Sequence, residues 1–152
     1  MKQVKGNLLT MAEAGDFDVI IHGCNCFCRM GAGIALQIKN QYPEAYEADQ
    51  YTVTGDKAKL GKYTFAITPK FTIINGYTQY RFDGRKSGKM DVDYDALRSV
   101  FKRVNKDFAG KRVGYPKIGC DLAGGNWAIV SVIIDQELVD VYHTFVEYDP
   151  EA

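Results

Sequence analysis

Short runs of apolar, β-branched residues alternate along this chain with amphipathic stretches. The first such run, 18–24 (DVIIHGC), is typical of a buried strand. Further strands are predicted at 62–68 and 71–75, both rich in β-branched and aromatic residues, and at 112–115 and 139–148. Strands that alternate with helices in this way predict an α/β fold with a largely parallel sheet.

Helices are predicted where apolar residues recur every three or four positions. In the clearest case Asp91 or Asp93 is the expected cap of a helix with one buried face. That face consists of Leu97, Val100, Phe101, Val104 and Phe108. An earlier helix is expected to end at Pro43, because proline is not tolerated in a helix interior, and another follows at 44–50. Asn126 is the expected cap of the last helix.

The composition is that of an ordinary globular protein. The 152 residues are 46% hydrophobic and 25% charged, which excludes disordered, collagen-like and coiled-coil classes. This length predicts one domain over residues 1–152. Nineteen basic residues balance nineteen acidic ones, so the broad positive field of duplex-DNA-binding or membrane-binding proteins is missing.

The four cysteines are Cys24, Cys26, Cys28 and Cys120, which form a poor disulfide framework and fit a reducing compartment. The first three alternate, with His22 in phase, so an extended chain would point them to one side and allow a zinc site. Structural zinc usually takes CxxC pairs, because CxC places two sulfurs poorly on one tetrahedron. Buried thiols are therefore favoured, and neither a metal nor a cofactor is expected.

Two segments, 20–35 and 116–127, each combine a strand end, a glycine-rich loop and a helix start. Glycines let backbone N–H groups approach an anion, and a helix N-terminus adds partial positive charge. In an open α/β sheet ligands bind beyond the carboxyl ends of the strands, where both loops would lie. The two loops together favour a diphosphate ligand over simple turns. The ATP-binding motif GxxxxGK[ST] is absent, and GAGIAL lacks the third glycine of a dinucleotide fingerprint.

The order and spacing of GNLL (6–9), DVIIHGCN (18–25), RMGAGIA (29–35) and IGCDLAGGNW (118–127) resemble the macro domain family over nearly the whole chain. The nearest branch contains ADP-ribose 1''-phosphate phosphatases of the yeast and phage type and terminal ADP-ribose-protein glycohydrolases. The resemblance implies a three-layer α/β/α fold with a six-stranded mixed, mostly parallel sheet, and ADP-ribose lying across its crest.

The expected function is metal-independent hydrolysis of ADP-ribose 1''-phosphate to ADP-ribose and phosphate. One alternative is removal of mono-ADP-ribose from protein or nucleic acid, and another is a binding module without catalysis. The expected partner is a small ADP-ribose derivative, with neither membrane nor stable nucleic-acid binding. The basic run 81–89 is interpreted as a solvated loop. We expect a monomer in the cytoplasm, or in the host cytoplasm if the protein is viral.

The resemblance also implies the ligand-binding residues. Adenine would lie near Asn7 and Leu8, where many macro domains have an aspartate, and would stack on Tyr148. As alternatives, Asn7 is a turn residue and Tyr148 a packing residue. Thr78 and Gln79 would bond the terminal phosphate or the distal ribose. The diphosphate would lie between two groups of loop residues: Gly119, Cys120, Leu122, Ala123, Gly124 and Gly125 on one side, and Gly31, Ala32, Gly33 and Ile34 on the other.

Three residues are candidates for catalysis. Asn25 matches the family asparagine that holds the distal ribose, although it could instead form an Asx turn. His22 matches the phosphatase branch and could move a proton near neutral pH; the alternative is a neutral histidine hydrogen-bonded inside the sheet. Asp121 interrupts the second glycine loop, either as a cap or as a base.

The chain departs from the glycohydrolases of this branch at two places. Those enzymes use a lysine after the fourth strand and an aspartate inside the second glycine loop. Gln79 and Ala123 stand at these positions here. Neither side chain forms a Schiff base or acts as a base, so the covalent mechanism is not expected.

Overall fold

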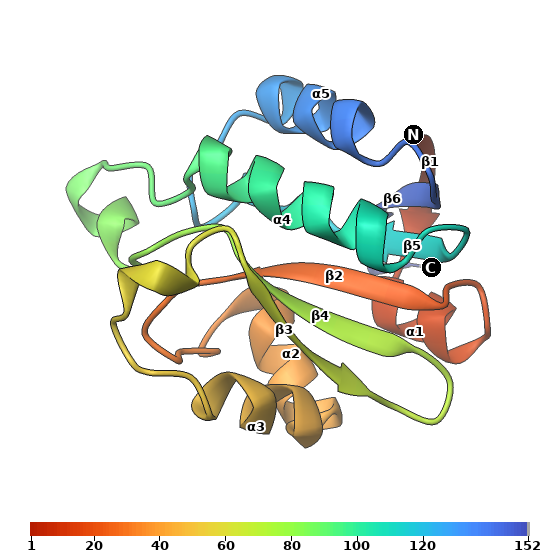
Figure 1. The fold of residues 1–152 in the computed structure, drawn as a ribbon, viewed down its shortest axis with the longest axis horizontal. Coiled ribbons are helices and arrows are strands. Elements are labelled where there is room, and N and C mark those ends of the chain that lie inside the picture. The colour runs from red at the N-terminus through yellow and green to blue at the C-terminus, as the bar shows by residue number, and fades with distance from the viewer. Residues whose placement is uncertain (152) are drawn as a thin grey trace.

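The structure is a computed structural model in which residues 1–151 are described. Two short 3-10 helices, Lys57–Lys59 and Gly84–Ser87, lie in loops. The main elements follow one another in the order β1 (Lys2–Gly6), α1 (Leu8–Glu13), β2 (Val19–Cys24), α2 (Gly33–Gln41), α3 (Pro43–Gln50), β3 (Tyr63–Ile67), β4 (Thr72–Tyr77), α4 (Tyr94–Asp107), β5 (Arg112–Tyr115), α5 (Trp127–Glu137) and β6 (Tyr142–Tyr148) (Figure 1).

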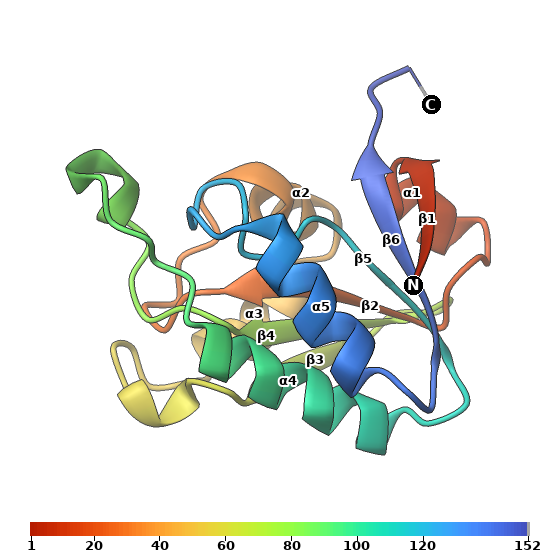
Figure 2. The same cartoon turned by 90° about the horizontal axis from the view of Figure 1, so that it is seen from above.

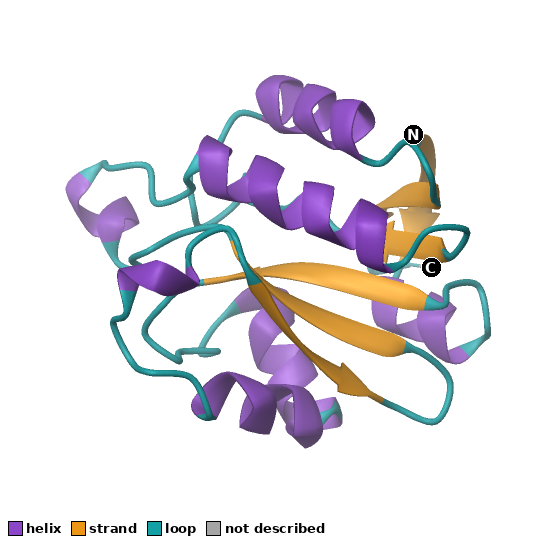
Figure 3. Cartoon of the chain, in the orientation of Figure 1, coloured by secondary structure: helices purple, strands orange, loops and turns teal. Residues whose placement is uncertain are grey.

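The strands form one six-stranded sheet in the order β1-β6-β5-β2-β4-β3. Every neighbouring pair is parallel except β3 and β4, which are antiparallel. This is the mixed, mostly parallel sheet that was expected (Figure 3). Because β1, β6, β5, β2 and β4 run in the same direction, their carboxyl ends lie along one edge, which we call the carboxyl edge.

Helices cover both faces of the sheet, with α4 and α5 on one face and α2 and α3 on the other (Figure 1). Each face has its own apolar core. On the α4 side Ile21 packs with residues such as Phe101, and on the α2 side Ile20 packs with Ile38. Successive residues of β2 therefore face opposite cores, and this explains why the strand is apolar at nearly every position.

Most of the predicted boundaries are confirmed. The side chains of Asp93 and Asn126 cap α4 and α5, each accepting a 2.9 Å hydrogen bond from a first-turn N–H group. Pro43 is the first residue of α3. The last strand begins at Tyr142 rather than at Val139, because the chain first turns after α5 through a bond from the Val139 N–H to the Glu137 carbonyl.

The hydrophobic pattern alone does not predict β1 or α1. The β1 strand lies at a sheet edge, and only Gly6 of its five residues is fully buried, so no apolar alternation marks it. The α1 helix has six residues, too few for a helical period to stand out. No helix within residues 1–151 is long and apolar enough to cross a membrane.

Candidate functional site

The sheet order brings the predicted ligand loops together along the carboxyl edge. Gly6 of β1 is paired with Tyr148 of β6, so the chain after β1 lies beside the end of β6. The glycine loop after β5 comes next, and the loop after β2 follows it. Segments that are more than 100 residues apart in the sequence thus form one continuous surface, ordered from β1 to β4.

The two glycine loops approach each other across this edge. A Cβ atom added at Gly33 would lie 4.0 Å from Cδ1 of Leu122. The second loop closes on itself through a 2.7 Å hydrogen bond from the N–H of Gly125 to the carbonyl of Gly119. Gly119 has a φ of +74°, and an added Cβ would lie 2.7 Å from Val92, so both conformation and space require glycine there.

The N-terminus of α2 is open to a ligand. Its cap residue, Ala32, has no side chain that can bond the first-turn N–H groups. The three residues Gly31, Ala32 and Gly33 are exposed. Helix α5 differs, because Asn126 occupies its capping position. The α2 N-terminus therefore offers unpaired donors and partial positive charge, both of which favour an anion.

His22 lies inside the sheet, with 1% of its surface exposed. Its Nε2 atom is 2.6 Å from Oδ1 of Asn75 on the neighbouring strand β4. Burial lowers the pKa of His22 to about 4, so the ring is neutral near neutral pH. This is the geometry of the second alternative, a neutral histidine inside the sheet. A ring so enclosed does not touch a ligand on the carboxyl edge, and the proton-transfer role has no support here.

Asn25 forms the Asx turn that was its alternative role. Its Oδ1 accepts hydrogen bonds from the N–H groups of Phe27 at 2.9 Å and Arg29 at 3.4 Å, and its Nδ2 donates to the Arg29 carbonyl at 2.9 Å. The residue is 8% exposed. One Nδ2 hydrogen remains without a role in this turn, because an amide nitrogen carries two.

Asp121 is exposed, and its carboxylate does not cap the loop that follows it. The N–H of Gly124 bonds to the main-chain oxygen of Asp121 at 3.3 Å instead. Helix α5 takes its cap from Asn126. The Asp121 carboxylate thus takes part in neither of these contacts. The polar groups of Asn25 and His22, in contrast, form hydrogen bonds within the protein.

The three clustered cysteines face different partners. The Sγ of Cys24 is 3.5 Å from Nε2 of His22, whereas Cys26 donates to the Gln79 carbonyl and Cys28 lies near Thr52. Burial raises the pKa of Cys26 to about 11 and also raises the pKa of Cys24 well above its usual range. Within residues 1–151 no group of three or more histidine, cysteine or acidic side chains is arranged to hold a metal ion. These thiols are buried packing residues.

Comparison with known proteins supports one family. No family model matches the chain. An uncharacterized 17.5 kDa protein of phage T4, from its tk-vs intergenic region, is 31% identical over 159 residues, which cover 99% of this chain and 97% of that protein. Among solved structures, the macrodomain of Mycobacterium tuberculosis DarG superposes with a TM-score of 0.71 and 26% identity, covering 98% of this chain and 97% of that one. The chain belongs to the macro domain family.

Other relatives of this macro domain carry functional names. The DNA ADP-ribosyl glycohydrolase of Mycobacterium tuberculosis is 28% identical over 140 residues, covering 88% of this chain but only 37% of that protein. The ADP-ribose 1''-phosphate phosphatase of Aspergillus oryzae is 34% identical over 67 residues, which cover 37% of this chain and 32% of that protein. A Bacteroides thetaiotaomicron structure described as of unknown function has a TM-score of 0.80 and 28% identity, covering 96% of each chain.

The residues predicted to lie near adenine include one capping residue and one exposed ring. Asn7 caps α1, because its Oδ1 accepts a 3.1 Å bond from the N–H of Thr10; this is the turn role. Leu8 is buried in the core. Tyr148 is 66% exposed at the end of β6, so its ring is available for stacking rather than used in packing.

The two residues after β4, Thr78 and Gln79, have different surroundings. Thr78 is fully buried, and its Oγ1 has no hydrogen-bond partner within residues 1–151. The bond from Thr78 to a terminal phosphate or to the distal ribose therefore stays a prediction. Gln79 donates from Nε2 to the Arg81 carbonyl at 2.8 Å, which holds the start of the next loop. Ala123 is buried, and Cys120 is half-buried with its pKa raised to about 11 by burial.

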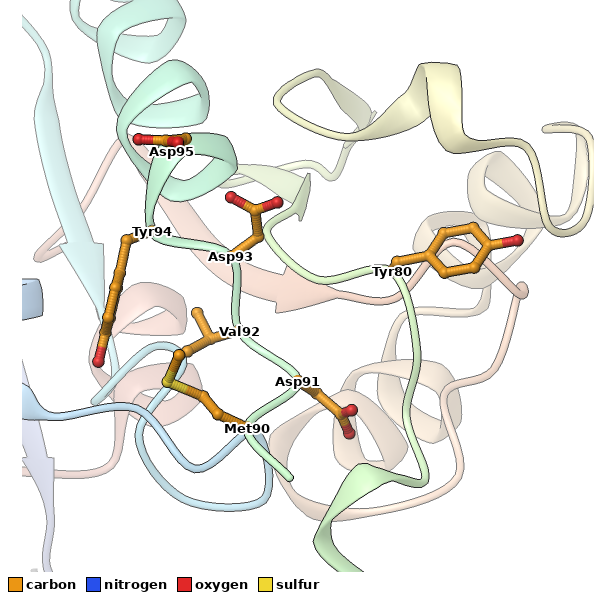
Figure 4. Close-up of a pocket in the computed structure, with 7 residues that line it drawn as sticks. All are labelled: Tyr80, Met90, Asp91, Val92, Asp93, Tyr94 and Asp95. Carbon is orange, nitrogen blue, oxygen red and sulfur yellow. The ribbon is translucent and has the colours of Figure 1, made fainter. Parts of the chain in front are cut away.

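A pocket beside the second glycine loop was not predicted. Its volume is about 500 Å³, and the lining residues are Tyr80, Met90, Asp91, Val92, Asp93, Tyr94 and Asp95 (Figure 4). The Ala123 carbonyl accepts bonds from the N–H groups of Asp91 at 2.9 Å and Val92 at 3.2 Å, so this segment packs directly on the loop. The only sequence signal was that Asp91 or Asp93 would cap a helix, which says nothing of a pocket.

Proposed function

We propose that this macro domain binds ADP-ribose along its carboxyl edge and hydrolyses the bond that joins the distal ribose to its substituent, with ADP-ribose 1''-phosphate as the first candidate substrate. The observation that carries the proposal is that three features occur together on one edge. An exposed ring at Tyr148, an uncapped helix N-terminus at Gly33 and an unused carboxylate at Asp121 match the aromatic, anionic and reactive parts of such a ligand.

The binding contribution of each part follows from its chemistry. Adenine would stack on Tyr148, and the diphosphate would lie between the α2 N-terminus and the Gly119–Gly125 loop, where backbone N–H groups bind oxygens without lysine or arginine. The free Nδ2 hydrogen of Asn25 would donate to a hydroxyl of the distal ribose.

Asp121 is the proposed base. It would take a proton from a water molecule whose oxygen forms a bond to phosphorus, while the bond from phosphorus to the ribose oxygen breaks and that oxygen is protonated by solvent. A carboxylate beside a phosphate costs electrostatic energy, and the α2 N-terminus offsets part of this cost. His22 has no part in the proposed step, because its ring is enclosed in the sheet.

A second candidate is release of ADP-ribose from nucleic acid or protein. It is supported by the relative named DNA ADP-ribosyl glycohydrolase, which matches 88% of this chain, whereas the phosphatase relative matches 37%. Gln79 and Ala123 stand where the glycohydrolases have lysine and aspartate, so this reaction would run without a covalent lysine intermediate. A binding module without catalysis would use the same ADP-ribose site on the carboxyl edge.

Calorimetric titration with ADP-ribose, followed by phosphate release from ADP-ribose 1''-phosphate, tests the proposal. Asp121→Asn should lower turnover by about 100-fold or more with little change in ADP-ribose affinity, because a base acts only in the transition state. Asp16→Asn is the matched control. Asp16 is also exposed, but it precedes β2 and therefore lies at the end of the sheet opposite the carboxyl edge. Binding without phosphate release would favour the second candidate, and absence of binding would overturn the proposal.

A further inference from the structure

We propose that residues 81–89, the basic loop, bind single-stranded nucleic acid beside the ADP-ribose site. The position beside an ADP-ribose site rests on the proposed function, whose second candidate, release of ADP-ribose from nucleic acid, such a surface would serve. The loop carries four exposed cations, Arg81, Arg85, Lys86 and Lys89, against one carboxylate, Asp83. None of the ion pairs formed within residues 1–151 involves these cations. A protein without net charge thus concentrates positive charge at one place.

Both ends of the basic loop are fixed to the ligand loops. Before it, the Tyr80 carbonyl accepts a 3.0 Å bond from the N–H of Cys26, in the first loop. After it, the N–H of Asp91 donates to the carbonyl of Ala123, in the second glycine loop. The Asp91 carboxylate also accepts a 3.0 Å bond from the N–H of Gly84 and so shapes the turn. A strand bound here would lie directly beside a bound ADP-ribose.

Aromatic rings line the base of the loop. Phe82 is 44% exposed, and its ring centroid is 6.0 Å from that of Phe27, which in turn lies 4.9 Å from Tyr80. Two more cations lie over these rings: Arg29 is 5.4 Å from the Phe82 centroid, and Lys57 is 5.1 Å from the Tyr80 centroid. Phe82 is the exposed ring of the three, whereas Phe27 and Tyr80 are half-buried. An exposed ring flanked by cations suits single-stranded nucleic acid, because a base can stack on the ring while phosphates pair with the cations.

Cations outnumber carboxylates over residues 81–94, with four cations against Asp83, Asp91 and Asp93. Asp91 bonds the Gly84 N–H, and Asp93 caps α4, so both face the protein's own backbone. The basic loop projects from the body of the molecule in both views, where a strand can reach it (Figures 1 and 2). The expectation of no stable nucleic-acid binding came from the overall charge, which averages out a local cluster. An acidic peptide would use the cations but would leave Phe82 without a stacking partner.

Fluorescence anisotropy with a labelled oligothymidylate of about 12 nucleotides tests binding directly. Arg85→Glu/Lys86→Glu should weaken binding by about tenfold or more, with a smaller salt dependence, because fewer phosphates are neutralised. Phe82→Ala should weaken it by about tenfold through lost stacking. Lys102→Glu/Lys106→Glu, the same charge change at exposed positions of α4, should leave binding within about twofold of wild type.

The proposal would be overturned by equal effects of the two charge reversals, or by competition by polyglutamate as strong as by unlabelled oligothymidylate. ADP-ribose calorimetry on the Arg85→Glu/Lys86→Glu variant separates the two proposals, because its affinity should equal that of the wild type. Oligonucleotide binding without any ADP-ribose binding would contradict the proposed function and leave the nucleic-acid surface standing. The reverse result would remove the nucleic-acid surface alone.

Discussion

The Nε2 atom of His22 lies 2.6 Å from Oδ1 of Asn75, inside the sheet. The Nδ2 of Asn75 donates to the Ala45 carbonyl at 2.9 Å and to Oγ1 of Thr64 at 3.1 Å, so its Oδ1 is left to accept. The histidine must therefore donate from Nε2, which selects one neutral tautomer. This pair links β2 to β4 and, through Ala45, to α3.

Stability should fall as the pH is lowered from about 6.5 to about 4. The pKa of His22 is about 4 in the folded chain and near its ordinary value when unfolded, so the unfolded state binds the proton first. His22 alone contributes about 3 kcal/mol to the loss at low pH. Urea unfolding at several pH values gives the free energy of unfolding as a function of pH. This free energy should depend less on pH in His22→Gln than in the wild type.

His143 provides the matched control for this measurement. Burial also lowers its pKa, so it contributes to the slope with the same sign. His143→Gln should therefore remove a separate part of the pH dependence and leave the His22 part in place. A slope that is unchanged in His22→Gln would contradict the neutral, enclosed histidine.

Gly119→Ala should abolish measurable ADP-ribose binding in calorimetry. The substitution places a Cβ 2.7 Å from Val92 at a residue with a φ of +74°, so the second glycine loop must change shape. Gly110→Ala is the control, because Gly110 has a φ of +80° but an added Cβ meets nothing within 4 Å. Both variants should lose about 1 kcal/mol or more of stability, whereas only the first should lose the ligand. Equal affinities would show that this loop does not hold the diphosphate.

Tyr148→Ala should weaken ADP-ribose binding by about two- to tenfold, since stacking contributes roughly 0.5–1.5 kcal/mol. Tyr142→Ala serves as the control: Tyr142 is exposed on the same strand but at its other end. Quenching of intrinsic fluorescence by the ligand gives both affinities. A larger effect at Tyr142 would place adenine elsewhere.

Asn25→Asp should reduce both stability and ADP-ribose affinity. The carboxylate can still accept from the N–H groups of Phe27 and Arg29, but it cannot donate to the Arg29 carbonyl or to the distal ribose. It also adds negative charge to the site of an anionic ligand. Higher salt should restore part of the affinity by screening that charge. Thermal unfolding and calorimetry at two salt concentrations measure these effects, and an affinity equal to that of the wild type would exclude Asn25 from the site.

Local sequence determined much of this fold. The caps at Asp93 and Asn126, the start of α3 at Pro43 and the buried strand β2 follow from interactions within a few residues, so their signals lie in short windows. The two glycine loops were visible for the same reason. Strand β1 was not, because its place depends on pairing with β6 at the far end of the chain.

Only the tertiary structure decided the roles of the individual site residues. The partner of His22 lies 53 residues away, and no short window of sequence predicts this contact, which holds the histidine inside the sheet. The same holds for the basic loop, whose two ends bond to loops that precede and follow it in sequence. A sequence pattern reports which groups are present, but burial and hydrogen bonding between distant segments determine which of them remain free to meet a ligand.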